Sequence, residues 1–219
     1  MVTVVKIGGS LFPEYTEELC ECLTKSEEKI VLVNGGGLLA NNIREFNKSF
    51  PFSDDVNHWN AIKCMDIIGH FIADENKNIV PITSLEEIEK VHNTHKIPLI
   101  LTYELMRKED PLKHSWNVTS DSIACWIANR INAKLLILTN VDGIYRGNIS
   151  SNNKKLIKSI KAKDLLFFKE TCIDKCLPKL LIKYHLDCFI INGKYPARVM
   201  AHLNSDNNIN NFYTHIGGE

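Results

Sequence analysis

The chain has 219 residues, of which 44% are hydrophobic and 24% are charged, and these are usual values for a globular protein. Basic and acidic residues number 26 each, so no excess charge would draw the chain to nucleic acid or to an anionic membrane. No apolar run reaches the roughly 18–20 residues that cross a bilayer, and the strand-like first residues leave no room for a signal peptide. We therefore expect a cytoplasmic protein without a nucleic-acid or membrane partner.

Short apolar, β-branched runs alternate with helix-like segments along almost the whole chain. The expected strands are residues 2–7, 30–33, 79–81, 98–101, 134–138, 187–191 and 212–216. Helical periodicity is found in residues 14–25, 38–46, 56–73 and 120–131. This alternation predicts an α/β fold with a mainly parallel central sheet, and no linker divides it, so we expect one domain over residues 1–219. The polar stretch 147–155 predicts an exposed loop or a hairpin tip, and 204–211 predicts a turn before the last strand.

Seven cysteines do not indicate a metal site. Cys172 and Cys176 are spaced like a pair of zinc ligands, but no obvious second pair accompanies them. The cysteine number is odd, and several lie inside apolar segments, which favours buried reduced thiols. No metal ligand is therefore predicted among the side chains.

Two glycine-rich loops each follow an expected strand and precede a possible helix. The first is Lys6-Ile-Gly-Gly-Ser10, and the second is Asn34-Gly-Gly-Gly37. Glycine lets the backbone approach an anion, and a helix start adds free N–H groups and a partial charge of roughly +0.5. Two such loops indicate a long anionic ligand or two anionic ligands that meet. Lys6 adds a fixed cation, and this combination suits phosphoryl transfer.

The second loop also permits another interpretation. Gly35-x-Gly37-x-x-Ala40 fits a dinucleotide fingerprint, and Asp54 or Asp55 lies near the distance expected for its acidic residue. A Rossmann-type oxidoreductase is therefore an alternative, although it leaves the first loop unexplained. A P-loop enzyme is disfavoured, because Gly193-Lys194 is followed by tyrosine and has no partner glycine upstream.

Three further segments complete the pattern, and each has a purely structural alternative. Asp121 and its hydroxyl neighbours in 116–124 fit a helix cap as well as a site. The segment 138–145 contains Asp142-Gly143, which is also a common turn. Lys179 follows a proline at an expected helix start, where a lysine is usually just solvated.

In this order, the five blocks resemble the amino acid kinase superfamily over essentially the whole chain. The resemblance implies a three-layer α/β/α sandwich and an ATP-dependent phosphotransferase that uses Mg²⁺. One departure is Asp174-Lys175-Cys176, where the family often has Gly-Gly-Met, so that Lys175 or Lys183 could replace Lys179. The second loop also lacks the histidine of isopentenyl phosphate kinases, which argues against an isoprenoid substrate.

The resemblance assigns roles to matching positions. Lys6, Asp121 and Lys179 are expected to be catalytic, with Asp121 organising the two lysines. The residues expected to bind the nucleotide are Gly8, Gly9, Ser10, Thr139, Asp142, Gly143 and Tyr145. The residues expected to bind a small-molecule phosphate substrate are Gly35, Gly36, Gly37, His58, Trp59, Asn117 and Thr119.

Within the superfamily, the segments around His58-Trp59 and 114–126 are similar to archaeal kinases of methanofuran biosynthesis. Those enzymes phosphorylate [5-(aminomethyl)furan-3-yl]methyl phosphate to the diphosphate. A cationic aminomethyl group would need a carboxylate or an aromatic face, and the candidates are His58, Trp59, Asp54 and Asp55, with Asp66 behind them. Uridylate kinase and a non-catalytic nucleotide-binding protein are the alternatives. Trp59 and Met65 could instead belong to the core or to the interface of a homo-oligomer.

Overall fold

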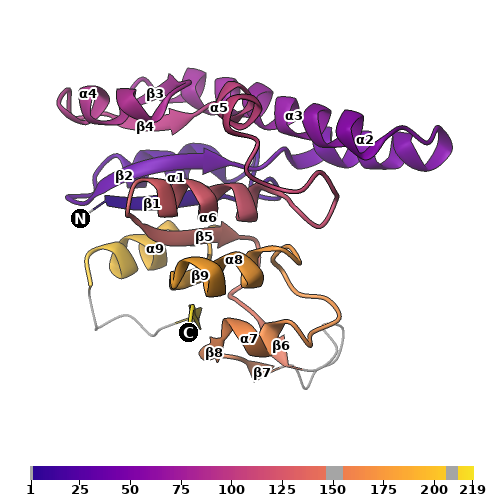
Figure 1. Cartoon of the computed structure of the whole chain (residues 1–219). Coiled ribbons are helices and arrows are strands. Elements are labelled where there is room, and N and C mark those ends of the chain that lie inside the picture. Colours follow the sequence, from indigo (N-terminus) through magenta and orange to yellow (C-terminus); the bar gives the residue numbers. More distant parts are fainter. Residues whose placement is uncertain (1, 147–154, 206–211) are drawn as a thin grey trace.

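Eight strands form one central sheet in the computed structural model, which describes residues 2–146, 155–205 and 212–219 (Figure 1). The strand order is β3-β4-β2-β1-β5-β9-β10-β8. Their bounds are β1 Val2–Ile7, β2 Lys29–Asn34, β3 Ile79–Ile82, β4 Ile97–Ile100, β5 Lys134–Thr139, β8 Ser159–Lys161, β9 Cys188–Asn192 and β10 Tyr213–Gly217. The first six strands of this order are parallel, whereas β10 is antiparallel to β9 and parallel to β8. The mainly parallel sheet expected from the sequence is confirmed.

Helices cover both faces of this sheet. They are α1 Thr16–Leu23, α2 Gly37–Ser49, α3 Asp54–Glu75, α4 Ile88–His92, α5 Thr102–Glu109, α6 Ser120–Arg130, α7 Ala162–Leu165, α8 Leu177–Tyr184 and α9 Pro196–Leu203, with a short 3-10 turn at Leu85–Glu87. A separate small hairpin pairs β6 Tyr145–Arg146 with β7 Lys155–Leu156. In the described part of the chain, no helix combines the length and the apolar character needed to cross a membrane.

Alternating strand residues pack into two apolar clusters, one on each face. On β1, for example, Val4 joins the cluster with α6 and α8, while Val5 joins the cluster with α1 and α9. Burial on both faces explains why the central strands are continuous apolar runs rather than alternating ones. The result is the three-layer α/β/α sandwich that the resemblance implied.

The sequence predicted the main elements but not all of their ends. The helix expected at 56–73 begins two residues earlier, because the Ser53 hydroxyl caps it by accepting from the Val56 N–H at 3.3 Å. The short elements α4, α5, α7, α9 and β6 to β8 were not predicted. Most of the loops expected at 147–155 and 204–211 lie outside the described residues.

The helix pair α2 and α3 projects past the carboxyl ends of the strands, at the right of Figure 1. From Ile62 onward α3 packs against the sheet, with Ile62 and Met65 in one apolar cluster and Ile68 and Ile72 in the other. Parallel strands β1, β2, β5 and β9 all end at this same edge, so their following loops lie together there. The projecting pair therefore forms a wall beside that edge.

Asp66 fixes α3 to the beginning of α5. Its carboxylate accepts hydrogen bonds from the backbone N–H groups of Thr102 at 2.6 Å and Tyr103 at 3.2 Å. These two N–H groups have no partner inside α5, so Asp66 serves as a helix cap from a distant element. Asp66, which the sequence placed behind the substrate candidates, is therefore engaged within the fold.

We expect Asp66→Ala to lower the free energy of unfolding by about 1–2 kcal/mol, because two amide groups of α5 lose their acceptor. Asp74→Ala is the matched control on α3, since Asp74 is exposed, and its effect should stay below about 0.5 kcal/mol. Urea unfolding with unchanged m-values measures both. Equal stabilities of the two variants would show that the cap contributes nothing.

Candidate functional site

The two glycine loops touch each other at the edge of the sheet. A Cβ atom at Gly9 would lie 2.3 Å from the Gly37 nitrogen, and Gly37 itself has a φ of +50°. Larger residues at these positions would force the loops apart. The N–H of Gly8 donates to the Leu138 carbonyl at 2.8 Å, and the N–H of Gly35 donates to the Ile7 carbonyl at 2.8 Å. These two amides hold the loops to the sheet, so any anion must be met by the later residues of each loop.

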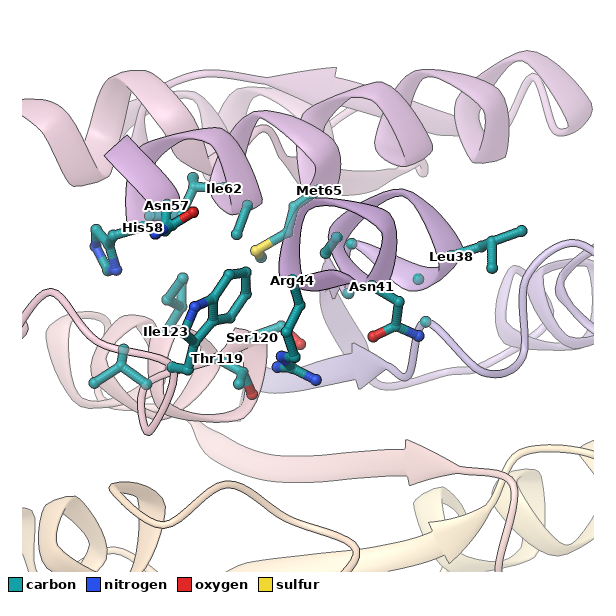
Figure 2. Close-up of a pocket in the computed structure, with 18 of the residues that line it drawn as sticks. Leu38, Asn41, Arg44, Asn57, His58, Ile62, Met65, Thr119, Ser120 and Ile123 are labelled. Atoms are coloured by element: carbon teal, nitrogen blue, oxygen red, sulfur yellow. The ribbon is translucent and has the colours of Figure 1, made fainter. Parts of the chain in front are cut away.

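A pocket of about 440 Å³ opens between these loops and the projecting helices, and we call it the glycine-loop pocket. Figure 2 shows Arg44 in its middle, with Asn57 and His58 toward one end and Leu38 at the other. The lining residues are Gly9, Ser10, Phe12, 35–38, Ala40, Asn41, Arg44, Asp54, Asn57, His58, Ala61, Ile62, Met65, Ser115, Trp116, 118–120 and Ile123. The second loop, His58 and Thr119 thus come together as the sequence suggested.

A second pocket, of about 790 Å³, lies on the other side of α6, and we call it the lysine pocket. Its lysines are Lys169, Lys175 and Lys179, and the segment 168–175 forms much of its wall. Arg44, Trp116 and Thr119 line both pockets. The two pockets therefore meet at these three residues.

A buried ion pair lies next to this junction. Lys6 at the end of β1 places its Nζ 2.7 Å from Oδ1 of Asp121 in the first turn of α6, and these side chains are 10% and 6% exposed. Asp121 also lines the lysine pocket. Two residues that are 115 positions apart in the sequence are thus combined into a fixed pair of charges with little water around it.

The carboxylate of Asp174 was not predicted to matter, yet it holds the beginnings of two helices. It accepts hydrogen bonds from the N–H and hydroxyl groups of Thr119, just before α6, and of Ser122, in its first turn, at 2.6 to 3.0 Å. It also accepts from the N–H groups of Cys176 and Leu177 at the start of α8, at 3.0 and 2.8 Å. Its own N–H donates to Oδ2 of Asp121 at 3.0 Å. The hydroxyl residues of segment 116–124 indicated a helix cap or a site in the sequence. Asp174, the carboxylate that they bind, could not be found in this way because it lies some 50 residues later.

The three lysines considered for the second catalytic position differ in placement. Lys175 and Lys179 line the lysine pocket. Lys183 does not, and its ammonium lies 5.3 Å from the centre of the Tyr184 ring. The structure therefore leaves Lys179 and Lys175 facing a ligand site.

The residues expected to bind a nucleoside have partners inside the protein. Oδ1 of Asp142 accepts from Asn192 at 3.0 Å and from Arg198 at 3.1 Å, and its Oδ2 accepts from the Tyr145 hydroxyl at 3.2 Å. A Cβ at Gly143 would meet the Thr214 hydroxyl at 2.3 Å. These residues and Thr139 line neither of the two pockets.

Trp59 also lies outside both pockets, unlike its neighbour His58. Its ring is 4.9 Å from the ring of His114, and the guanidinium of Arg107 lies over it at 4.6 Å. Asn117, expected at the substrate, lines the lysine pocket instead of the glycine-loop pocket. Trp59 and His114 thus pack against His58, which lines the pocket, without lining it themselves.

The rings of His58 and His114 stack at 4.4 Å, and their surroundings shift the two pKa values in opposite directions. Both ring nitrogens of His114 donate to carboxylates, at 2.6 Å to Asp55 and 2.8 Å to Asp110, and these bonds raise the pKa of His114. Burial, and then the neighbouring His114, lower the pKa of His58 to about 4. At neutral pH, His58 therefore offers the pocket an uncharged imidazole.

Within the described residues, no three His, Cys, Asp or Glu side chains form a group that could hold a metal ion. All seven cysteines are free thiols.

The family model named "Amino acid kinase family" matches residues 1–171. The [5-(aminomethyl)furan-3-yl]methyl phosphate kinase of Methanocaldococcus jannaschii is 34% identical, over 98% of this chain and 97% of its own. Among solved structures, uridylate kinase from Archaeoglobus fulgidus has a TM-score of 0.75 at 18% identity, covering 99% of this chain and 100% of that one. Isopentenyl phosphate kinase from T. acidophilum has a TM-score of 0.65 at 16% identity, again covering 99% and 100%. Since the family model spans most of the chain and a relative matches nearly all of it at 34% identity, this chain belongs to the amino acid kinase family.

Proposed function

We propose that this chain is an ATP-dependent cytoplasmic kinase that converts a phosphate monoester into a diphosphate, and that the acceptor is [5-(aminomethyl)furan-3-yl]methyl phosphate. A relative that is 34% identical to this chain is a kinase of that compound. The observation that carries the proposal is the meeting of two pockets beside the buried Lys6–Asp121 pair. Such a junction suits two phosphate-bearing ligands that must be placed end to end.

The lysine pocket suits the phosphates of ATP, because Lys175 and Lys179 line it and Lys6 lies beside it through its contact with Asp121. In the proposed reaction, an oxygen of the acceptor phosphate forms a bond to the γ-phosphorus. The bond from the γ-phosphorus to the β–γ bridging oxygen breaks, and ADP leaves with that electron pair. A phosphate monoester has a second pKa of about 6, so its attacking oxygen is already deprotonated at neutral pH. Asp121 is therefore proposed to orient Lys6 rather than to act as a base.

The donor set near the lysine pocket fits a Mg²⁺ ion that is held mainly by the nucleotide phosphates. The oxygens of Asp174 are occupied by hydrogen bonds, and Asp121 is paired with Lys6. Mg²⁺ commonly binds substrate phosphates with one or two carboxylates and several waters. When bound, the ion would neutralise phosphate charge, while Lys6 and Lys179 would position the transferring group.

The end of the glycine-loop pocket near His58 suits a small cationic group. Asp54 lines the pocket at the first turn of α3, and His58 adds a neutral ring with a free nitrogen lone pair. A carboxylate and a neutral imidazole can both accept hydrogen bonds from an ammonium group. The carboxylate of Asp55, by contrast, is bonded to His114. Asp54 and His58 are thus proposed to bind the aminomethyl group.

We expect ADP to form when ATP, Mg²⁺ and [5-(aminomethyl)furan-3-yl]methyl phosphate are supplied, and far more slowly with uridylate or isopentenyl phosphate. Coupled ADP release and ³¹P NMR of the diphosphate product measure this. Asp54→Asn should raise the KM for the aminomethyl compound roughly tenfold, which corresponds to about 1.4 kcal/mol.

Asp55→Asn is the matched control for Asp54→Asn, because it changes the same charge one residue further along the same helix turn. It should leave that KM within about threefold. ATP binding without turnover of any of the three acceptors would refute the kinase proposal and favour a nucleotide-binding role.

We expect Lys6→Met and Asp121→Asn each to lower kcat by at least about 100-fold, because each removes one charge beside the transferring group. Loss of one partner of a buried pair also costs about 3–5 kcal/mol of stability, so thermal unfolding must accompany the assay. The double variant Lys6→Met/Asp121→Asn should recover stability without activity, because no charge is left unpaired and the Asp174 N–H keeps an acceptor. The control Lys25→Met breaks the exposed ion pair with Glu21 and should change neither kcat nor the melting temperature. Full activity of either single variant would contradict the assignment.

We further propose that the protein is a homo-oligomer that associates through the tip formed by α2 and α3. Phe46, Phe50 and Phe52 are 57%, 59% and 51% exposed there, and the rings of Phe46 and Phe50 lie 5.2 Å apart. Grouped exposed aromatic rings are typical of interaction surfaces.

Light scattering after size exclusion should give a mass above that of one chain. The double variant Phe46→Ser/Phe50→Ser should have the mass of one chain, because the apolar contact area is lost. Phe167→Ser is the control, since Phe167 is 87% exposed in another part of the fold, and its mass should match the wild type. A wild-type mass of one chain would refute this proposal.

A further inference from the structure

Arg44 stands out when the charges around the glycine-loop pocket are compared. Among the described residues that line this pocket, Arg44 is the one side chain with a permanent positive charge. His58 is neutral near pH 7, because its pKa is about 4. A phosphate in this pocket would therefore rely on loop amides and on Arg44 for its charge neutralisation.

Arg44 also lines the lysine pocket, so that its guanidinium lies at the junction of the two. Figure 2 shows it reaching down from α2 toward Thr119. The guanidinium carbon lies 4.6 Å from the centre of the Trp116 ring, and Trp116 lines both pockets too. Stacking on an aromatic face restrains a guanidinium while leaving its N–H edges open to other partners.

These N–H edges are not used by a carboxylate of the protein. Arg130 and Arg198 form ion pairs with Glu109 and Asp142, whereas Arg44 forms none with any described carboxylate. Arg44 is only partly exposed, and a partly buried cation without an anionic partner is costly. An anionic ligand at the junction would supply the missing partner.

Phosphate acceptors pose an electrostatic problem that a hydroxyl acceptor does not. Two highly charged phosphate groups must approach within bonding distance, and Lys6 is already partly neutralised by Asp121. A planar guanidinium can bind oxygens of two phosphates at once through its several N–H groups. The position of Arg44, between the proposed acceptor and donor pockets, suits this task.

We propose that Arg44 is a catalytic residue that binds the acceptor phosphate and the transferring phosphoryl group together, with Trp116 holding its guanidinium in place. This inference rests on the proposed function, because it assumes that the glycine-loop pocket receives a phosphate acceptor. It assigns to α2 a direct part in the reaction.

The test compares Arg44→Ala and Arg44→Lys with Arg107→Ala. Arg107 is the matched control, because its guanidinium also lies 4.6 Å from a tryptophan ring, that of Trp59, but lines neither pocket. Arg44→Ala should lower kcat/KM for the acceptor about 100- to 1,000-fold, while the ATP dissociation constant changes less than about threefold. Arg44→Lys should keep part of the activity, and Arg107→Ala should keep nearly all of it.

Added guanidinium chloride at low millimolar concentration should restore Arg44→Ala at least roughly tenfold and leave Arg107→Ala unchanged, since only the first variant has an empty cation position at the junction. Activity of Arg44→Ala within about threefold of Arg107→Ala would overturn the inference. If Arg44→Ala lost about 100- to 1,000-fold of kcat/KM, was not rescued by guanidinium and had a lower melting temperature, Arg44 would be a structural residue. This result would also overturn the inference.

The proposed function itself fails if the wild-type protein phosphorylates none of the three acceptors. In that case calorimetric binding of inorganic phosphate, which needs no turnover, decides on Arg44. Weaker binding to Arg44→Ala than to wild type and Arg107→Ala would support the anion-binding role, and equal binding to all three would overturn it.

Discussion

The arrangement of the site depends on the carboxylate of Asp174. It collects hydrogen-bond donors from Thr119 and Ser122 at the start of α6 and from Leu177 at the start of α8. One side chain thus fixes the relative position of the helix that carries Asp121 and the helix that carries Lys179. Because helix starts have N–H groups without partners, a shared carboxylate satisfies both starts and draws them to one place. The same residue supports Asp121 directly through its own backbone N–H.

This support matters because the Lys6–Asp121 pair is buried. Bringing two charges out of water costs several kcal/mol, and their attraction offsets this cost only when the geometry is good. The pair lies between the end of the central strand β1 and the first turn of α6, and both are fixed by the sheet and by Asp174. A site whose charges are held before any ligand arrives needs little reorganisation when charge develops on a phosphoryl group.

The sequence was informative wherever function depends on local chain geometry. Apolar β-branched runs predicted the central strands, and the glycine loops after two of them predicted two anion-binding turns, which the structure places in contact. It was not informative about contacts between distant segments. Arg44 resembles any surface residue of an amphipathic helix, and only the packing of α2 beside Trp116 places it at the junction of the pockets. Trp59 and Asp142 belong to conspicuous local motifs, yet the sequence did not predict the contacts that they make with His114 and Arg198.

The projection of α2 and α3 beyond the sheet divides the molecule into parts that can change at different rates during evolution. The ion pair is built on β1 and α6, whose residues also form the core, so substitutions there disturb folding. The far wall of the glycine-loop pocket belongs to a helix pair whose outer surface is largely exposed. New acceptors can therefore arise through mutations in this peripheral hairpin at positions other than Arg44, while the buried Lys6–Asp121 pair is kept.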